Sequence, residues 1–175
     1  LVKNAALSFA AAFGIKETLQ AIDSYKLLEA RIKLVTSSTS EQVAVQQKLF
    51  DIATKTRSSY EDTVKLYAKI ALSAKDYGVS QREIIDLTQT VQQAIKLSGA
   101  TAAEASSGVL QFAQALGSGK LQGDELKSLF ENSSRLVKAI ADGYKDANGK
   151  IGVTIGDLRK LGEQGKLTTS SIVEA

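Results

Sequence analysis

The sequence predicts an all-α fold, in which long amphipathic helices form a hairpin and a compact, glycine-punctuated helical module follows. Three observations support this. The 175 residues contain no proline, which favours long uninterrupted helices because proline breaks the backbone hydrogen-bond ladder. Apolar residues recur every three or four positions through most of the chain. Several Ser-x-x-Glu or Thr-x-x-Glu patterns precede such runs and indicate helix starts.

A single long helix is expected over roughly 3–36, ending at the TSSTS cluster (36–40). Its apolar positions recur about every 3.5 residues, which is typical of helices that wrap around a partner helix. This coiled-coil-like stripe is apolar on more faces than a lone surface helix should be, so it is a candidate oligomer face. The predicted face comprises Ile15, Leu19, Ile22, Leu28, Ile32 and Val35.

The region 37–117 is expected to be a helical hairpin region. Four capping boxes are predicted, at Ser38 with Glu41, Ser58 with Glu61, Ser80 with Glu83 and Thr101 with Glu104. In each, the hydroxyl accepts from a free backbone N–H group of the first helical turn. Three glycines that follow the last apolar position of a run predict left-handed helix ends, namely Gly78, Gly99 and Gly117.

The region 118–175 is expected to be a small helical module. Nine of the thirteen glycines lie from Gly117 onward, so shorter helices are predicted near 123–132, 134–142, 154–163 and from 168 to the end. The segments GKLQGDEL (119–126) and GKLTTSSI (165–172) both place Gly-Lys-Leu just ahead of a helix start. Glycine permits the turn, and we expect the leucine to pack back on the core. The alternating IGVTIG (151–156) is too short to build a sheet.

The composition removes most catalytic chemistry. Histidine and cysteine are both absent, which excludes the commonest general base, thiolate nucleophiles and the usual zinc ligands. The 22 basic and 19 acidic residues are interleaved, so no nucleic-acid arm is visible and no sequence-specific nucleic-acid binding is expected. The chain begins at Leu1 and contains no methionine, which predicts a segment of a longer protein.

Two motifs resemble ligand sites but fail on detail. In the run GSGK (117–120), Gln114 stands where a phosphate-binding P-loop needs glycine, and Leu121 stands where it needs Ser or Thr. A helix-to-helix turn is the better interpretation. The run DGYKDANGKIG (142–152) has no register that places both the oxygen ligands and the glycine of a calcium loop. We therefore expect a solvated turn there, with no metal, no cofactor and no catalytic residue, and the chain is predicted not to be an enzyme.

Two long segments carry a resemblance to a known family. SGKLQGDELKSLFENSSRLVKAIADG (118–143) and GVTIGDLRKLGEQGKLTTSSIVEA (152–175) resemble the conserved N-terminal-region domain of phage tail tape measure proteins. The family pattern places Gly-x-Leu-x-Gly before the first helix and Gly-Lys-Leu-Thr before the last. The insertion YKDANGKIG (144–152) departs from it. The resemblance assigns structural roles to Gly119, Leu121, Gly123, Glu125, Leu126, Gly156, Leu158, Leu161, Gly165 and Leu167.

The resemblance implies a structural segment of a phage or prophage tail, which sets tail length and assists tail assembly and DNA passage. Its implied partners are tail tube and tail tip proteins, tail assembly chaperones and further copies of itself, and the parent protein is expected to contact a membrane transiently. The implied location is the tail of the virion, with the bacterial cytoplasm during assembly.

Two alternatives remain open. In one, the chain is a helical membrane-active or secreted toxin fragment whose residues 1–15 insert into lipid. That stretch is short of a membrane span, and Lys3, Asn4 and Ser8 interrupt it, so a buried or partner-facing helix is preferred. In the other, carboxylates that converge only in three dimensions make the chain a hydrolase.

Overall fold

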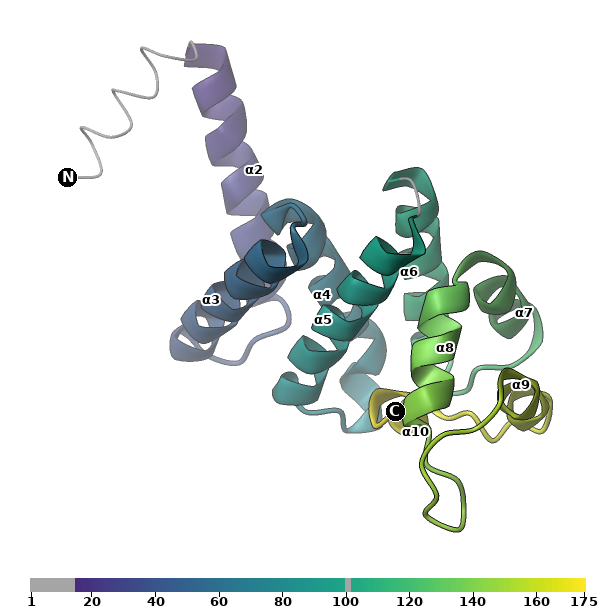
Figure 1. Ribbon diagram of the computed structural model, residues 1–175. Coiled ribbons are helices and arrows are strands. Elements are labelled where there is room, and N and C mark those ends of the chain that lie inside the picture. The colour runs from purple at the N-terminus through teal and green to yellow at the C-terminus, as the bar shows by residue number, and fades with distance from the viewer. Residues whose placement is uncertain (1–14, 100–101) are drawn as a thin grey trace.

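The computed structural model describes residues 15–99 and 102–175 (Figure 1). Nine α-helices, one short 3₁₀ helix and no strand lie within this described part, which confirms the all-α prediction. The elements are α2 (Ile15–Lys33), α3 (Thr39–Thr56), α4 (Tyr60–Ala74), η1 (Lys75–Tyr77), α5 (Gln81–Ser98), α6 (Ala102–Gly117), α7 (Gly123–Asn132), α8 (Ser134–Gly143), α9 (Ile155–Glu163) and α10 (Thr169–Val173).

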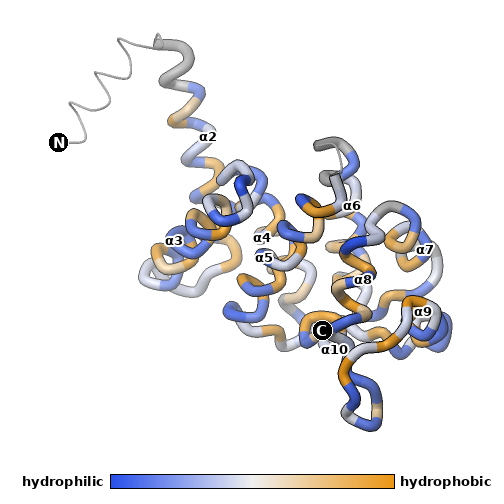
Figure 2. The backbone as a smooth tube through the Cα atoms, in the orientation of Figure 1, coloured by the Kyte–Doolittle hydropathy of each residue, from blue (hydrophilic) through white to orange (hydrophobic). Residues whose placement is uncertain are grey.

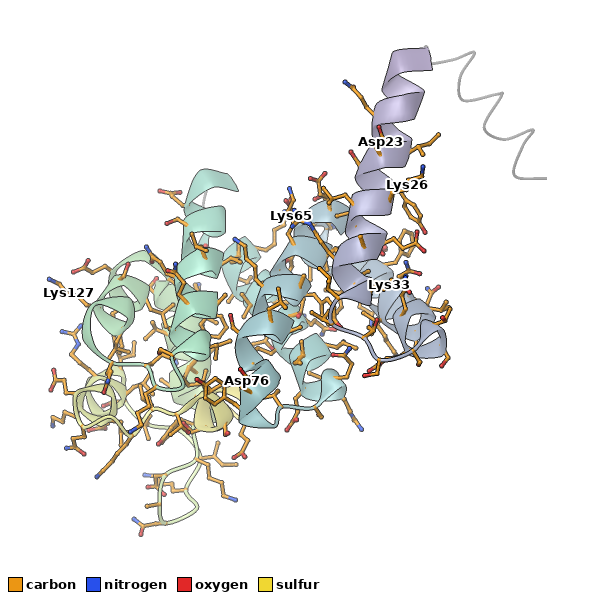
Figure 3. All side chains as sticks on the ribbon, turned by 180° about the vertical axis from the view of Figure 1, so that it is seen from behind. Asp23, Lys26, Lys33, Lys65, Asp76 and Lys127 are labelled. Atoms are coloured by element: carbon orange, nitrogen blue, oxygen red, sulfur yellow. The ribbon has the colours of Figure 1, made fainter. Side chains whose placement is uncertain are left out.

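Helix α2 projects from the rest of the molecule (Figure 1). Its C-terminal half packs on α3 and α4, where Leu28 and Ile32 are buried. Its other half carries the labelled Asp23 and Lys26 away from the neighbouring helices (Figure 3). The helix ends at Lys33 rather than near residue 36. Residues 3–14 of the predicted helix lie outside the described residues.

Helix α4 lies at the centre of the bundle and contacts α2, α3, α5 and α6. It can do so because it is apolar on more than one face, with Val64, Tyr67 and Ile70 all fully buried. The buried Gln92 of α5 donates from Nε2 to Thr63 Oγ1 of α4 (3.1 Å). That hydrogen bond satisfies two buried polar groups and fixes the register of the two helices.

The predicted caps at Ser80 and Ser38 form, one in full and one in part. Ser80 and Glu83 make the reciprocal capping box, with Glu83 N donating to Ser80 Oγ (3.3 Å) and Ser80 N to Glu83 Oε2 (2.7 Å). These bonds from Ser80 lower the pKa of the Glu83 carboxyl. Ser38 Oγ accepts from Glu41 N (3.2 Å), but the Glu41 carboxylate accepts from Ser37 N instead (2.6 Å).

The predicted cap of Ser58 with Glu61 is wrong by one residue. Arg57 adopts a left-handed conformation (φ 52°) and ends α3, so that Ser58 N donates back to Ala53 O (2.9 Å). Ser59 is therefore the residue that caps α4, and its Oγ accepts from Asp62 N (3.0 Å). The Thr101 cap lies outside the described residues.

The predicted glycine helix ends are confirmed at two of three positions. Gly78 and Gly99 have left-handed φ values of 70° and 69°, although η1 intervenes between α4 and Gly78. The prediction at Gly117 is wrong, because Gly117 is the last residue of α6 and the left-handed conformation falls at Gly119 (φ 80°). The helix continues through Gly117 because Ser118 N donates to Gln114 O (3.0 Å).

The four C-terminal helices match the predicted ranges within one residue, apart from the end of α10, which comes two residues early at Val173. Helix α8 packs on α5, and α10 packs on α5 and α6. The buried side chains therefore form one cluster from Leu28 to Ile172, and the hydrophobic segments of successive helices face inward (Figure 2). Among the helices described, none is both long and apolar enough to cross a bilayer.

Candidate functional site: the paired Gly-Lys-Leu segments

The two Gly-Lys-Leu segments lie side by side in the structure. Lys120 and Thr168 form an antiparallel bridge, in which Leu121 N donates to Leu167 O (2.8 Å) and Thr169 N donates to Gly119 O (3.1 Å). Residues 119–121 and 165–169 are called the paired segments below. Sequence analysis found the repeated tripeptide but gave no reason to expect its two copies to pair.

The paired segments alternate between buried and exposed side chains. Leu121 and Leu167 are each 1% exposed, whereas Lys120 and Lys166 are exposed. This alternation follows from extended backbone, in which successive side chains point to opposite faces. The leucines therefore pack on the core as predicted. The buried Thr169 adds a third tie, since its Oγ1 donates to Leu116 O at the end of α6 (2.7 Å).

Glycine is required at the start of the first segment. Gly119 has a left-handed φ of 80°, and a Cβ there would lie 2.8 Å from both Cε1 and the hydroxyl oxygen of Tyr77. The Tyr77 hydroxyl donates to Gly117 O (2.9 Å), so the ring covers the turn. Tyr77 of η1 thus packs over the turn that joins α6 to α7.

Two further glycines of the motif also hold left-handed conformations. Gly123 (φ 63°) begins α7, and Gly165 (φ 64°) precedes the second leucine. A Cβ at Gly165 would lie 3.2 Å from Gln122 Oε1, so the two segments approach closely here. Left-handed backbone strains residues that have a Cβ, which explains the residue type at both positions.

Helices α7 and α9 pack through the remaining motif residues. Leu126 and Leu158 are buried, and Leu161 is half-buried against the same core. Gly162 of α9 is buried too, and a Cβ there would lie 2.1 Å from Leu126 Cδ2. Sequence analysis missed Gly162. A glycine inside an expected helix is the signal that could have indicated this close helix contact.

Other residues link α9 to its surroundings. Arg159 places its guanidinium 5.0 Å from the centre of the Phe130 ring of α7, a favourable cation–π contact. Thr154 caps the helix by accepting from Asp157 N (3.1 Å), and its hydroxyl donates to the Asp157 carboxylate (2.6 Å). This hydroxyl holds the pKa of Asp157 below its ordinary value. The motif residue Gly156 is exposed, whereas the side chain of Glu125 lies outside those that the structure describes.

The predicted oligomer face divides into two parts. Leu28 and Ile32 are buried against this chain's own helices, and Val35 is partly buried against them. Ile22 is exposed. The side chains of Ile15 and Leu19 lie outside the described ones. Among the described side chains of the face, Ile22 is therefore the one left exposed.

The two rejected ligand motifs have local structural roles. Residues 118–122 join α6 to α7, and the amide of Leu121 is used in the pairing. Asp146 closes the tip of a hairpin, where its Oδ1 accepts from Asn148 N (2.8 Å) and Lys150 N (2.9 Å). The Leu121 amide and the Asp146 carboxylate are thus both hydrogen-bonded within the chain.

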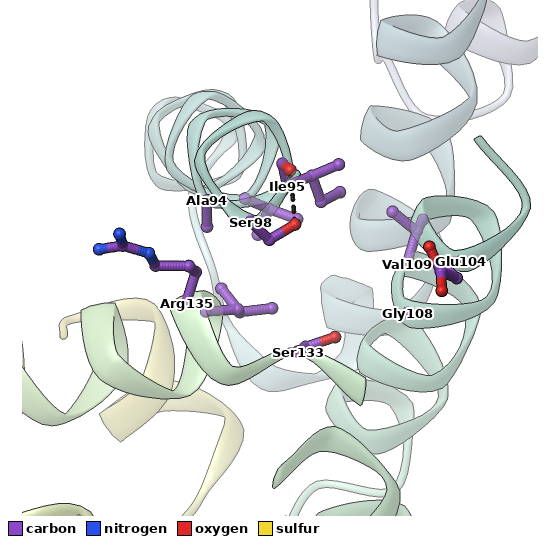
Figure 4. Close-up of a pocket in the computed structure, with 10 residues that line it drawn as sticks. Ala94, Ile95, Ser98, Glu104, Gly108, Val109, Ser133 and Arg135 are labelled. Carbon is purple, nitrogen blue, oxygen red and sulfur yellow. Dashed lines mark hydrogen bonds between the residues drawn. The ribbon is translucent and has the colours of Figure 1, made fainter. Parts of the chain in front are cut away.

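A small cavity of about 20 Å³ lies between α5, α6 and α8 (Figure 4). It has room for about one water molecule. A Cβ at Gly108 would lie 2.8 Å from Ser133 Oγ, so the helices approach closely beside it. In the described part of the chain, no three acidic side chains gather in a way that could hold a metal ion. The leucines of the motif are thus buried or half-buried, and its glycines Gly119, Gly123 and Gly165 hold left-handed turns.

Comparison with known protein families gives a match over most of the chain. A family model described as "Tape measure protein" matches residues 16–175, which is most of the chain and includes all the motif residues above. No curated protein and no solved structure matches.

Proposed function

Since the chain belongs to the tape measure protein family, a family of phage tail structural proteins, we propose that it is a non-enzymatic part of a tail tape measure that helps to set tail length. It also assists tail assembly and DNA passage through contacts with tail tube and tail tip proteins and with tail assembly chaperones. It acts in the bacterial cytoplasm during assembly and afterwards in the tail of the virion. The observation that carries this proposal is the family match over 16–175.

The geometry of the C-terminal region supports an assembly role. The glycines of the motif allow the backbone of residues 119–121 to pair with that of residues 165–169, and its leucines pack α7 against α9. These contacts within residues 118–175 support a preformed docking surface in this region. We assign the contacts with tail proteins to this region, and we assign helix-to-helix association to region 1–36.

Self-association is proposed through the exposed part of the α2 face. Ile22 and the neighbouring Tyr25 are both exposed side chains of α2. They lie three positions apart and so share one side of the helix. A second copy would cover these side chains, as in a coiled coil, and Ile15 and Leu19 would continue the contact.

The test of the tape measure role is the length of the tail. In-frame deletions are made in helical regions of the parent protein outside residues 1–175, and tails are measured by electron microscopy. Tails should shorten by about 1.5 Å per residue removed, which is the rise of an extended helix. Unchanged tail length would contradict the proposal, and a matched series of conservative substitutions controls for effects on expression.

A further inference from the structure

The hairpin between α8 and α9 projects from the helices (Figure 1). Its two sides pair at Lys145 and Ile151. The tip carries the dipeptide Asn148-Gly149, and both of these residues are exposed. Asparagine is a chemically labile side chain, so the hairpin presents a labile group to solvent at its most exposed point.

The groups on either side of the bond between Asn148 and Gly149 are open to reaction. Among the described residues, none forms a hydrogen bond with the Asn148 side-chain amide. A Cβ at Gly149 would meet nothing closer than Lys145 Cε, at 3.7 Å. Because glycine has no side chain, its backbone nitrogen is less shielded than that of any other residue. Gly149 N can therefore approach Asn148 Cγ whenever the turn opens.

These two atoms can form a succinimide. Attack of Gly149 N on Asn148 Cγ makes a new N–Cγ bond and closes a ring. The Cγ–Nδ2 bond breaks, and ammonia leaves with the proton that Gly149 N gives up. Water from the solvent then opens the ring. Its addition at Cγ yields aspartate, whereas its addition at the main-chain carbonyl carbon yields isoaspartate, in which the backbone runs through the former side chain. The balance requires no oxidant and no reductant.

The closed hairpin holds the attacking nitrogen in a hydrogen bond. Gly149 N donates to Asp146 O (2.9 Å), and Gly149 is left-handed (φ 80°), as in three-residue hairpin loops. Asp146 Oδ1 accepts from Asn148 N (2.8 Å) and Lys150 N (2.9 Å), and Asp146 N donates to Lys150 O (3.0 Å). Asp146 thus takes part in all four of these hydrogen bonds, and the reaction requires the tip to open.

The tip can open while the rest of the protein stays folded. Residues 147–150 are all exposed, so opening breaks hydrogen bonds but separates little buried apolar surface. The base of the hairpin is held separately, because Tyr144 is buried and Val153 N donates to Ala141 O (2.8 Å). Two of the four tip hydrogen bonds end on the Asp146 carboxylate, which therefore governs how often Gly149 N is free.

We propose that Asn148 is a site of spontaneous deamidation, whose rate is set by the Asp146 carboxylate. A neutral amide becomes a carboxylate, so the net charge of the chain falls by one from +3. Isoaspartate lengthens the backbone by a methylene group, and the hydrogen bonds of Gly149 and Lys150 with Asp146 are then lost. The modification accumulates with the age of the protein and loosens the tip alone. This inference rests on the hairpin and is independent of the tape measure role.

The test is mass spectrometry of the purified full-length protein during several weeks at neutral pH. Cleavage after arginine places Asn148 in peptide 136–159, which contains no other amide side chain, and Asn132 in peptide 83–135. Peptide 136–159 should gain the mass of an amide-to-acid exchange, and electron-transfer fragmentation should identify isoaspartate at position 148.

Asn132 is the internal control. It is the last residue of α7, and the next backbone N–H group, that of Ser133, donates to Leu129 O (2.9 Å). The serine side chain also shields this nitrogen. Asn132 should therefore react at least about tenfold more slowly than Asn148, because opening of a packed helix end is rarer than opening of an exposed tip.

Three variants test the role of the tip. Asp146→Ala should raise the rate at Asn148 about tenfold, because two hydrogen bonds to a charged group are lost. Asp142→Ala removes a carboxylate from the same peptide and changes the net charge equally, but Asp142 pairs with Lys138 (2.6 Å), so the rate should stay unchanged. Asn148→Gln should abolish the mass gain, because its longer side chain does not close the same ring.

Four outcomes would overturn the inference. They are no mass gain at Asn148 over several weeks, equal rates at Asn148 and Asn132, equal rates in Asp146→Ala and Asp142→Ala, and a faster rate in Asp146→Ala that is accompanied by loss of helical content in circular dichroism. The last outcome would assign the protection of Asn148 to the whole fold and not to the Asp146 carboxylate.

Discussion

Two glycines six residues apart in α9 have opposite surroundings. Gly162 is buried, and a Cβ there would overlap Leu126 and lie 3.3 Å from Leu121 O. Gly156 is exposed, and a Cβ there would meet nothing closer than 3.7 Å. Neither has a left-handed φ. Their sequence contexts alone do not separate a packing glycine from one that is merely tolerated.

We therefore predict opposite effects of the same substitution. Gly162→Ala should lower the free energy of unfolding by about 1–3 kcal/mol, since the methyl group forces Leu126 out of its packed position. Gly156→Ala should raise it by up to about 1 kcal/mol, because alanine favours the helix. Urea unfolding followed by circular dichroism measures both. Equal effects of the two substitutions would show that α9 does not pack on α7 as described.

The Tyr67 hydroxyl is buried and has no hydrogen-bond partner among the described residues. The nearby Gln81 amide donates instead to Val35 O (3.1 Å). Burial raises the pKa of Tyr67 above its ordinary value of 10.0, and the charge of Glu41 adds to the rise. The folded state thus resists ionisation of this group, whereas the unfolded state ionises near pH 10 and gains stability from it.

Tyr67→Phe should therefore be at least as stable as the natural sequence at pH 7, with a gain of about 1 kcal/mol from removing an unsatisfied hydroxyl. Below pH 10 the Tyr67 hydroxyl is neutral in both states, so its ionisation does not affect stability; above pH 10 the unfolded state ionises first, and the natural sequence loses stability as the pH rises toward the raised pKa of the folded state. The advantage of the variant should thus widen above pH 10. Urea unfolding at pH 7 and pH 10.5 measures it, with exposed Tyr25→Phe as the control. A destabilised Tyr67→Phe would mean that the hydroxyl has a partner.

At the scale of elements, the boundary between α3 and α4 shows what local patterns leave out. The pattern of Ser58 with Glu61 predicts a cap at Ser58, whereas Ser59 caps α4 in the structure. Because Arg57 is left-handed, Ser58 N points back to α3 and donates to Ala53 O, which leaves Ser59 as the first residue free to cap α4. A positive φ at arginine is rare, so a pattern of residue types does not predict it.

We predict that Ser59→Ala lowers the free energy of unfolding by about 1 kcal/mol, as is usual for loss of an N-cap. Ser58→Ala should cost clearly less, because the Ser58 hydroxyl makes only longer contacts with Thr56. Thermal unfolding of the two variants separates them. If Ser58→Ala were the more destabilising of the two, Ser58 would be the cap, as the sequence pattern predicts.

Much of the element structure is visible in the sequence, because helix periodicity, caps and glycine ends act over a few residues. The boundaries of the C-terminal helices were predicted within two residues for this reason. The pairing of Gly119 with Thr169 was not, since it joins residues fifty positions apart. Three further contacts also join separate elements, and local patterns do not encode them. They are Tyr77 with Gly119, Thr169 with Leu116, and Gly162 with Leu126.

At the scale of the whole molecule, α2 stands apart because part of its apolar surface is not covered by the bundle. The residues that the sequence grouped into one oligomer face serve two purposes. Leu28 and Ile32 anchor the helix to α3 and α4, and Ile22 with Tyr25 remains exposed. The division into parts 1–36, 37–117 and 118–175 stays a prediction, while the buried cluster extends from α2 to α10.

We predict that Ile22→Lys with Tyr25→Lys raises the dissociation constant for self-association about tenfold or more, because charged side chains replace the exposed apolar contact. Leu97→Lys on α5, a still more exposed position outside the face, should leave the dissociation constant unchanged. Sedimentation equilibrium over a range of concentrations measures both. A natural chain that stays monomeric throughout would contradict the proposed role of α2.

The paired segments also have a mechanical consequence. A pulling force applied between α6 and α10 would be borne first by the backbone hydrogen bonds that join Gly119 to Thr169 and Leu121 to Leu167. Helices α7, α8 and α9 would bear no tension until those hydrogen bonds broke. Residues 123–163 therefore form a loop shielded from tension, and that loop can keep its shape while the rest of the chain is stretched.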